Sequence, residues 1–391
     1  MPTIMCSSSV TYGEAAFSTL GDVRVKEGRA IDKTDLTDAD LLVIRSTTPV
    51  RADMLTDSRL RFVGTATIGV DHMDLAHFDR NGIHWEHAPG CNAVSVAEYM
   101  TSVWLCLAAE HGVALEGRTL GVVGVGHVGS RVARKAAALG MRVLLNDPPK
   151  AEAGIPATEA SGLPDVAYCD LETLLGESDL VTMHVPLTSD GPHATHHMVN
   201  DGFCAQLKPG CVFINAARGP IAQSDALIKA IDSGRIAHAV IDTWEGEPCC
   251  RQDLLERVRL ASPHIAGYGF DGKVRGTEMI YAAACRFLGV APTWTPAAQL
   301  PAPLVPKIAI AKAAATRDAF LWDVVRQTYD VREDDARMRA GAVGDDDQRA
   351  TDFDAQRSGY PVRREFGFTS VRCHDADPAW MQTLQALGFV I

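Results

Sequence analysis

Short apolar runs alternate with helix-like stretches over most of the chain, and this alternation is typical of a parallel α/β structure. Near the N-terminus the apolar runs predict strands at residues 41–44, 60–64 and 83–87. We expect these strands to form a small, mainly parallel sheet that ends before Pro89 and Gly90. The long apolar stretch 96–108 then predicts a helix that leads into a second domain.

Further apolar runs predict the strands of a second sheet, at residues 120–123, 142–147, 180–184, 211–215, 238–242 and 258–261. Helical stretches separate these runs, so we expect a doubly wound parallel sheet. The insertion 149–168 is rich in Ala, Gly and Pro and is expected to form a surface loop. A helix predicted over 272–288 would return the chain to the first domain, which would then be discontinuous.

The composition changes from Pro292 onward, which indicates a further small α/β domain. Its expected parts are a helical stretch 311–331, an acidic loop 344–347, a strand over 365–373 and a last helix 378–387. The predicted architecture therefore has a doubly wound dinucleotide-binding domain, a discontinuous flavodoxin-like substrate (lid) domain and a small C-terminal α/β domain. Their expected ranges are 93–265, 1–92 with 266–290, and 291–391.

A glycine-rich turn follows the first strand of the second sheet, in the segment Leu120-Gly-Val-Val-Gly-Val-Gly-His-Val-Gly-Ser130. Gly124 permits a tight turn, Gly126 lets a pyrophosphate approach the backbone, and Gly129 lets helix and strand pack closely. Asp147, about twenty residues further on, is placed to accept hydrogen bonds from a ribose diol. This combination of strand, turn, helix and acid predicts dinucleotide binding.

The charge and the cysteine content narrow the class of protein. The chain has 391 residues and a formal net charge of -12, which disfavours nucleic acid and anionic membranes as partners. No apolar run is long enough for a signal sequence or a membrane span, so we expect a cytoplasmic protein. The ten cysteines lack paired spacing, which favours reduced thiols over a disulfide framework.

Three residues that follow predicted strands of the second sheet could carry out chemistry, because open α/β sheets bind ligands at the carboxyl ends of their strands. Arg218 could hold a substrate carboxylate with two parallel hydrogen bonds, although a surface arginine in a turn is the alternative. His264 lies on a constrained backbone and could take a hydroxyl proton, although an isolated histidine is more often structural. Glu247 could orient that imidazole.

The cluster His193-Ala-Thr-His-His197 has spacing that resembles a metal site. We expect it to lie in a loop without nearby Cys, Asp or Glu partners. No metal is therefore predicted.

Four segments together resemble the D-isomer-specific 2-hydroxyacid dehydrogenases over residues 40–290. They are the glycine turn, the turn Ala216-Ala-Arg-Gly219, and the segments Asp242-Thr-Trp-Glu-Gly-Glu-Pro248 and Pro263-His-Ile-Ala-Gly-Tyr268. The resemblance implies a catalytic set of Arg218, Glu247 and His264, with NAD as cofactor.

The resemblance also implies residues that contact the ligands. Substrate contacts are expected at Ser46, Thr67, Arg218 and Tyr268. NAD contacts are expected at Gly124, Gly126, His127, Val128, Gly129, Asp147, Val185, Ala216, Ala217, Arg218, Asp242 and Gly267. Two of these depart from the family pattern, because His127 replaces a more usual asparagine and Val185 a common threonine.

Within the family, the chain is similar to the branch that oxidises 4-phospho-D-erythronate at C2, a step of pyridoxal 5'-phosphate biosynthesis. This narrower resemblance rests on Arg45-Ser-Thr-Thr48, on Val63 to His72, on Gly246 and Tyr268, and on the tail segments 329–335, 360–366 and 387–389. It implies a phosphorylated 2-hydroxy acid as substrate, a 2-oxoacid as possible acceptor for reoxidation, and a homodimer through the C-terminal domain. Arg45 could add positive charge for the substrate phosphate; this expectation rests on its position in the sequence and not on the resemblance.

Two alternatives remain open. One is another D-2-hydroxyacid dehydrogenase, of the 3-phosphoglycerate type. The other is a non-catalytic, NADH-sensing, corepressor-like protein, for which a long disordered tail would be expected in place of a folded C-terminal domain.

Overall fold

A computed structural model describes residues 1–297 and 299–391. The chain divides into two compact units. Unit 1 comprises residues 1–92 and 269–302, and unit 2 comprises residues 93–268 and 303–391. Within unit 2 we refer to residues 303–391 as the C-terminal region. The predicted division into three domains stays a prediction.

Unit 1 is built on a five-stranded parallel sheet in the order β2-β1-β3-β4-β5. The strands are β1 (Thr3–Ser7), β2 (Asp22–Lys26), β3 (Leu41–Ile44), β4 (Phe62–Thr65) and β5 (His84–His87). This is the strand order of flavodoxin-like folds, as predicted. The apolar runs at 41–44, 60–64 and 83–87 therefore do form neighbouring strands.

Both faces of this sheet are covered, because successive side chains of a strand point to opposite sides. Ile4, Leu41 and Phe62 pack against one group of helices, and Met5 and Leu42 pack against the other. The first group is α1 (Gly13–Phe17) and α12 (Phe270–Leu288), and the second is α2 (Lys33–Leu36) and α3 (Leu75–Asn81), with a 3-10 turn at Gly28–Ala30. Burial on both faces explains why the central strands read as continuous apolar runs.

Unit 2 contains a six-stranded parallel sheet in the order β11-β10-β9-β8-β6-β7. The strands are β6 (Thr119–Val123), β7 (Arg142–Asn146), β8 (Leu180–Met183), β9 (Cys211–Asn215), β10 (Ile236–Ile241) and β11 (Leu260–Ala261). The chain winds from β6 to β7 in one direction and from β8 onward in the other. The point of reversal, between β6 and β8, is where doubly wound sheets bind their ligands.

Helices cover both faces of this sheet. One layer is α4 (Ala93–His111) and α5 (His127–Ala138), and the other is α8 (Leu171–Glu177), α9 (Asp201–Gln206) and α10 (Ser224–Asp232). Shorter helices are α6 (Pro148–Glu152), α7 (Ala157–Ser161) and α11 (Gln252–Leu255), with a 3-10 turn at Gly219–Ile221. No helix among the described residues combines the length and the apolarity that a membrane crossing requires.

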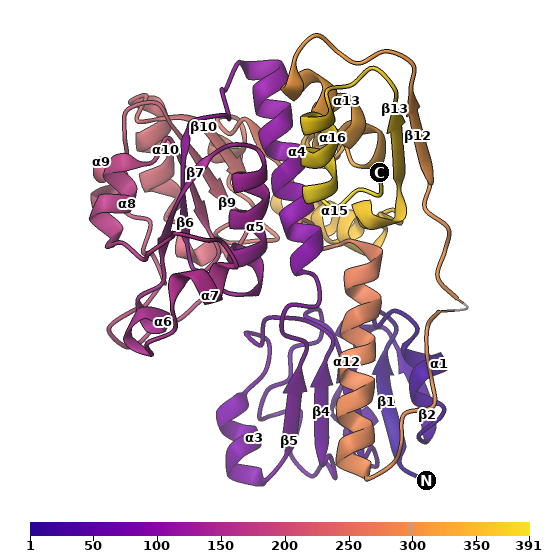
Figure 1. The fold of residues 1–391 in the computed structure, drawn as a ribbon. Helices are drawn as coiled ribbons and strands as arrows, with labels where there is room; N and C mark the ends of the chain where they lie inside the picture. The colour runs from indigo at the N-terminus through magenta and orange to yellow at the C-terminus, as the bar shows by residue number, and fades with distance from the viewer. Residues whose placement is uncertain (298) are drawn as a thin grey trace. The chain divides into compact units, whose positions relative to one another are not determined.

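The C-terminal region shares a hydrophobic core with α4. Its elements are β12 (Lys307–Ile310), α13 (Arg317–Thr328), α14 (Val331–Gly341), α15 (Asp346–Ser358), a 3-10 turn (Phe366–Phe368), β13 (Ser370–Cys373) and α16 (Pro378–Ala386). Phe320 and Leu384 are fully buried in one cluster with Tyr99 and Trp104 of α4. Figure 1 shows α4 running between α5 and the helices α13 and α16. The helix is therefore buried nearly all round.

Four predictions for irregular or single elements are wrong. The expected surface loop 149–168 contains α6 and α7, because Asp147 caps α6 and proline is tolerated in a first helical turn. The expected acidic loop 344–347 begins α15, where Asp345 accepts a hydrogen bond from the Gln348 amide and acids favour the helix N-terminus.

The other two errors concern stretches of the C-terminal region. The expected helix 311–331 is α13 alone, with α14 starting after the break at Tyr329 and Asp330. The expected strand 365–373 is a strand only over Ser370–Cys373, which pairs in parallel with β12. Apolar content alone does not separate a short strand from a 3-10 turn.

We predict that Phe320→Ala destabilises all of unit 2. The substitution empties a fully buried site in the core shared with α4 and should lower the free energy of unfolding by about 3–5 kcal/mol. Denaturant unfolding combined with hydrogen exchange at the β6 and β8 amides measures the effect. Phe368→Ala, at a side chain 44% exposed, is the control and should change stability by less than about 0.5 kcal/mol. Unaltered exchange in β6 and β8 would show that the C-terminal region unfolds separately.

Candidate active site

The glycine turn after β6 has the geometry that a pyrophosphate site requires. Gly124 has a φ of +89°, and a Cβ there would lie 2.7 Å from the backbone of His184. A Cβ on Gly129 would lie 1.9 Å from the carbonyl oxygen of Gly124, so helix α5 could not approach the turn with any other residue. A Cβ on Gly126, in contrast, would meet no atom within 4 Å. Gly126 is therefore open to a ligand at the N-terminus of α5, which fits the phosphates of a dinucleotide.

Asp147 lies at the end of β7, beside the glycine turn. One carboxylate oxygen accepts a hydrogen bond from the Val125 amide at 2.8 Å, and the other accepts one from the Lys150 amide at 3.2 Å. Each carboxylate oxygen has a second lone pair, so these bonds hold the side chain in place and leave acceptor capacity for a ribose diol. The predicted ribose contact is compatible with this arrangement and stays a prediction.

The residues of the expected catalytic set come from three loops at the same edge of the sheet. Arg218 follows β9, Glu247 follows β10 and His264 follows β11, and these strands are neighbours in this order. The first two loops touch through Gly219, where a Cβ would lie 1.9 Å from the carbonyl oxygen of Trp244. This close approach brings the loop that carries Arg218 against the loop that carries Glu247.

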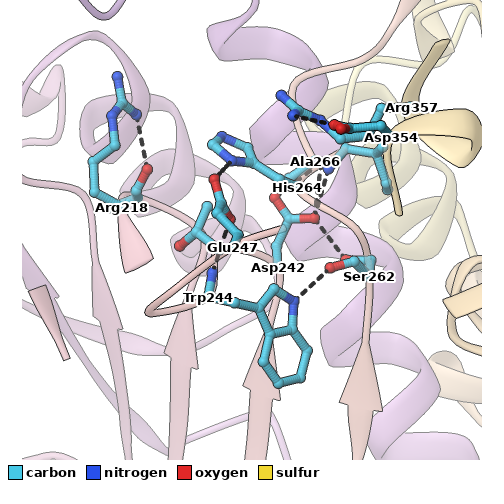
Figure 2. Close-up of polar contacts among 12 residues, drawn as sticks. Arg218, Asp242, Trp244, Glu247, Ser262, His264, Ala266, Asp354 and Arg357 are labelled. Carbon is cyan, nitrogen blue, oxygen red and sulfur yellow. Dashed lines mark hydrogen bonds and ion pairs between the residues drawn. The ribbon is translucent and has the colours of Figure 1, made fainter. Parts of the chain in front are cut away.

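Glu247 and His264 form a hydrogen-bonded pair, as Figure 2 shows. A carboxylate oxygen of Glu247 lies 2.6 Å from Nδ1 of His264, and its other oxygen accepts a hydrogen bond from the Trp244 amide at 3.0 Å. Burial would raise the pKa of Glu247, but the charge and the hydrogen bond of His264 outweigh it and leave this pKa below its usual value. Glu247 is thus an ionised partner that leaves Nε2 of the imidazole free of this bond.

Buried Asp242 fixes the loop that carries His264. Its side chain is 1% exposed and accepts hydrogen bonds from the Ser262 hydroxyl at 2.6 Å and from the Ile265 amide at 2.8 Å. The Ala266 amide is a third donor, at 3.1 Å. Burial raises the pKa of Asp242, while these donors and the charge of His264 oppose the rise. The backbone of His264 has a φ of +55°, which few residues other than glycine adopt, so the loop depends on this external support.

Arg218 lies in the loop next to this pair. One guanidinium nitrogen donates to the carbonyl oxygen of Ala217 at 2.8 Å, and the backbone of Arg218 is held by the amide of Asn215 at 3.1 Å. Figure 2 shows the side chain extended on one side of the His264 ring. A guanidinium presents five donors in a planar fork, a geometry that matches a carboxylate.

The remaining predicted NAD contacts of unit 2 lie at the same edge of the sheet. His127, exposed, and Val128 begin α5, and Val185 follows β8. Ala216 and Ala217 precede Arg218, and Gly267 follows the loop held by Asp242. Their contacts to NAD, like those of Asp242, stay predictions.

The predicted substrate residues are divided between the two units. Ser46 and Thr67 lie in unit 1, after the adjacent strands β3 and β4, with Ser46 exposed. The Thr67 hydroxyl donates to the carbonyl oxygen of Gly69 at 2.9 Å. Tyr268 lies in unit 2, half-buried, with its ring edge-on to Tyr360 at 5.8 Å between centroids.

The expectation that the cluster at 193–197 lacks acidic partners is wrong. His193 pairs with Glu152 at 2.9 Å and His197 with Glu245 at 2.6 Å, because the chain folds distant carboxylates onto this segment. Among the described residues, no group of three or more His, Cys, Asp and Glu side chains is arranged to hold a metal ion. His193 and His197 are therefore each the partner of a single carboxylate.

Sequence reasoning missed several residues that shape the site. Ser262 supports Asp242, and Trp244, 1% exposed, donates from its indole to the carbonyl oxygen of Ser262 at 2.9 Å. From the C-terminal region, Arg363 donates to the carbonyl oxygen of Ala266 at 2.7 Å. Arg357 packs over the ring of Tyr268. The polar triplet Ser262-Pro-His264 could have indicated the first of these, whereas nothing in the local sequence singles out either arginine.

We predict opposite effects for alanine at two glycines of the turn. Gly129→Ala should lower the free energy of unfolding by about 1–3 kcal/mol, because its Cβ meets the Gly124 carbonyl. Gly126→Ala should lower the free energy of unfolding by less than about 1 kcal/mol, because its Cβ would meet no protein atom. It should weaken NAD binding about tenfold or more, because the Cβ would occupy the space in which the ligand is expected. Denaturant unfolding measures the loss of stability in each variant, and NAD titration measures the loss of affinity. Unchanged NAD affinity in Gly126→Ala would contradict the assignment.

We predict an acid-dependent stability difference between the native protein and Glu247→Gln. Because the pKa of Glu247 is lowered in the folded state, its stabilisation is present above the ordinary value of 4.5 and is lost as the pH falls through the lowered value. The difference in unfolding free energy should therefore narrow below about pH 4.5. Unfolding titrations between pH 3 and 5.5 measure it. Glu152→Gln, which removes the exposed partner of His193, is the matched control and should show little difference throughout.

Comparison with known families agrees with this geometry. Residues 95–266 match the family described as "D-isomer specific 2-hydroxyacid dehydrogenase, NAD binding domain". Residues 299–388 match a domain of unknown function, DUF3410. Among solved structures, D-lactate dehydrogenase from Aquifex aeolicus, complexed with NAD and lactic acid, is 26% identical with a TM-score of 0.62. The match covers 73% of this chain and 95% of that one.

Curated relatives match over nearly the whole chain. Erythronate-4-phosphate dehydrogenase of Pseudomonas putida is 41% identical over 388 residues, 99% of both chains. The enzyme of the same name from Salinibacter ruber is 43% identical, over 93% of this chain and 92% of its own. The loops after β9, β10 and β11 thus belong to a member of the D-isomer-specific 2-hydroxyacid dehydrogenases, in the erythronate-4-phosphate dehydrogenase family.

Proposed function

We propose that this protein catalyses the NAD-dependent oxidation of 4-phospho-D-erythronate at C2 to 2-oxo-3-hydroxy-4-phosphobutanoate. The observation that carries the proposal is the Glu247–His264 pair beside Arg218, in a chain similar over nearly its full length to enzymes of that name. The product belongs to a route toward pyridoxal 5'-phosphate. The cytoplasm is the proposed location.

His264 is the proposed base. Its Nδ1 is engaged by Glu247 at 2.6 Å, which fixes the ring and leaves Nε2 to take the proton of the C2 hydroxyl. The ionised Glu247 stabilises the imidazolium that results. The support from Asp242 to the Ile265 and Ala266 amides keeps the ring in place during this transfer.

Arg218 is proposed to bind the C1 carboxylate and to polarise the C2 oxygen. A guanidinium matches a carboxylate with two parallel hydrogen bonds, which orients C2 toward His264. Ser46, Thr67 and Tyr268 are the further substrate contacts proposed. Arg45 follows β3 and could add charge.

NAD, when bound, accepts the hydride that leaves C2. The open space at Gly126, the α5 N-terminus and the Asp147 carboxylate are the features of the chain that fit its pyrophosphate and ribose. A carboxylate at the ribose also disfavours the 2'-phosphate of NADP.

The C-terminal region is proposed to mediate a homodimer, and a 2-oxoacid is proposed as the acceptor that reoxidises the cofactor. The folded elements from β12 to α16 favour the enzyme over a corepressor-like protein, for which a disordered tail is expected. The rival within the family is an enzyme for 3-phosphoglycerate.

We predict that the purified protein oxidises 4-phospho-D-erythronate with a higher kcat/KM than 3-phosphoglycerate. In His264→Asn, turnover should fall about 100- to 10,000-fold while NAD binding is retained, because only the base is lost. Steady-state kinetics with NAD, with and without an added 2-oxoacid, measure both. A preference for 3-phosphoglycerate would contradict the substrate, and near-normal turnover by His264→Asn would contradict the base.

A further inference from the structure

The C-terminal region places a half-buried arginine beside the catalytic pair. Arg357 lies in the last turn of α15, and its side chain is 15% exposed. Figure 2 shows its guanidinium next to the loop of His264 and Ala266. The roles proposed for Arg218, Glu247 and His264 do not account for a cation at this place.

Arg357 hydrogen-bonds Tyr268 with its side chain, but its contacts leave its Nε unused. Its nearest carboxylate oxygen is on Asp354, at 3.8 Å, which is beyond hydrogen-bond distance. The guanidinium lies 5.7 Å from the ring centre of Tyr268, and its Nε has no hydrogen-bond partner among the described residues. A buried donor without a partner is costly, so a ligand that accepts from it would stabilise the site.

The charge of Arg357 persists despite its burial. Burial would lower the pKa of Arg357, but Tyr268 and Glu247 outweigh it and raise this pKa. The positive charge therefore faces the residue predicted to contact the substrate.

The order of the charged groups around His264 matches the order of the groups in the proposed substrate. In Figure 2 the ring of His264 lies between Arg218 on one side and Arg357 on the other. The substrate has the same order, with the C1 carboxylate at one end, the reacting C2 next and the phosphate at C4. A second guanidinium is therefore available for the second anion, which carries a charge of about -1.5 to -2 at neutral pH.

The solved relatives support a role in substrate selection. The match to the D-lactate dehydrogenase spans 95% of that enzyme but only 73% of this chain, so about a quarter of this chain has no counterpart there. The region 299–388, which carries Arg357, has about that size. Lactic acid has no phosphate and requires no second cation.

We propose that Arg357 binds the C4 phosphate of the substrate beside Tyr268, so that the C-terminal region selects for a phosphorylated acid. The inference rests on the proposed function. A purely structural arginine, packed on Tyr268 and Phe353, would affect all substrates alike.

We predict that Arg357→Gln separates phosphorylated from unphosphorylated substrates. The value of kcat/KM for 4-phospho-D-erythronate should fall roughly ten- to one-hundred-fold, the loss expected for one hydrogen-bonded charge. The value for D-erythronate, which lacks the phosphate, should change little. Competitive inhibition by inorganic phosphate should weaken in parallel.

Two further variants complete the test. Arg357→Met keeps the packing of the alkyl chain and should show the same change in selectivity. It replaces Arg357→Gln in the test if that variant fails to fold. Arg349→Gln, on the same helix, removes a guanidinium that binds Gly344 and Asp346 and should leave both substrates unaffected.

The outcomes distinguish the two proposals. A native enzyme that does not oxidise 4-phospho-D-erythronate would overturn the proposed function. An active native enzyme with equal losses on both substrates in Arg357→Gln, or with an unchanged ratio, would overturn only the phosphate contact.

Discussion

The buried carboxylate of Asp242 is the interaction on which the geometry of the active site depends. It accepts hydrogen bonds from the Ser262 hydroxyl and from two successive amides of the loop after β11. In this loop His264 adopts a positive φ. A strained backbone persists only where its surroundings determine it, and here one acceptor at the end of β10 does so. Glu247, from the same loop as Trp244, then meets His264 at hydrogen-bond distance. The Glu247–His264 pair and its support thus come from two adjacent strand ends, those of β10 and β11.

The sequence was sufficient for those features that depend on local chemistry. Buried parallel strands need apolar residues on both faces. The continuous apolar runs of β3, β8 and β9 were therefore enough to predict these strands. Gly124 and Gly129 are required by a positive φ and by a close contact, both of which the glycine pattern indicates. Arg218, Glu247 and His264 were singled out because each follows a strand, where ligands bind.

Features that depend on distant segments could not be predicted in this way. Nothing near Arg357 in the sequence indicates that α15 ends beside Tyr268. The two residues are far apart in the sequence, and only the folding of the segments between them brings them into contact. The same holds for Glu152 and Glu245, which supply partners to a histidine cluster that was expected to have none. The helices α6 and α15 were missed for a different reason, since Asp147 and Asp345 act as helix caps within segments that also read as turns.

The burial of α4 on all sides has a consequence for biosynthesis. Its apolar surface faces α5 on one side and Phe320 and Leu384 of the C-terminal region on the other. A ribosome that has completed the strands of the unit 2 sheet at Ala261 still has about 60 residues to add before Phe320 and about 120 before Leu384, at about 5–20 residues per second. For several seconds the nascent chain therefore carries an uncovered hydrophobic helix. Chaperones that recognise such surfaces have their natural opportunity to bind during that interval.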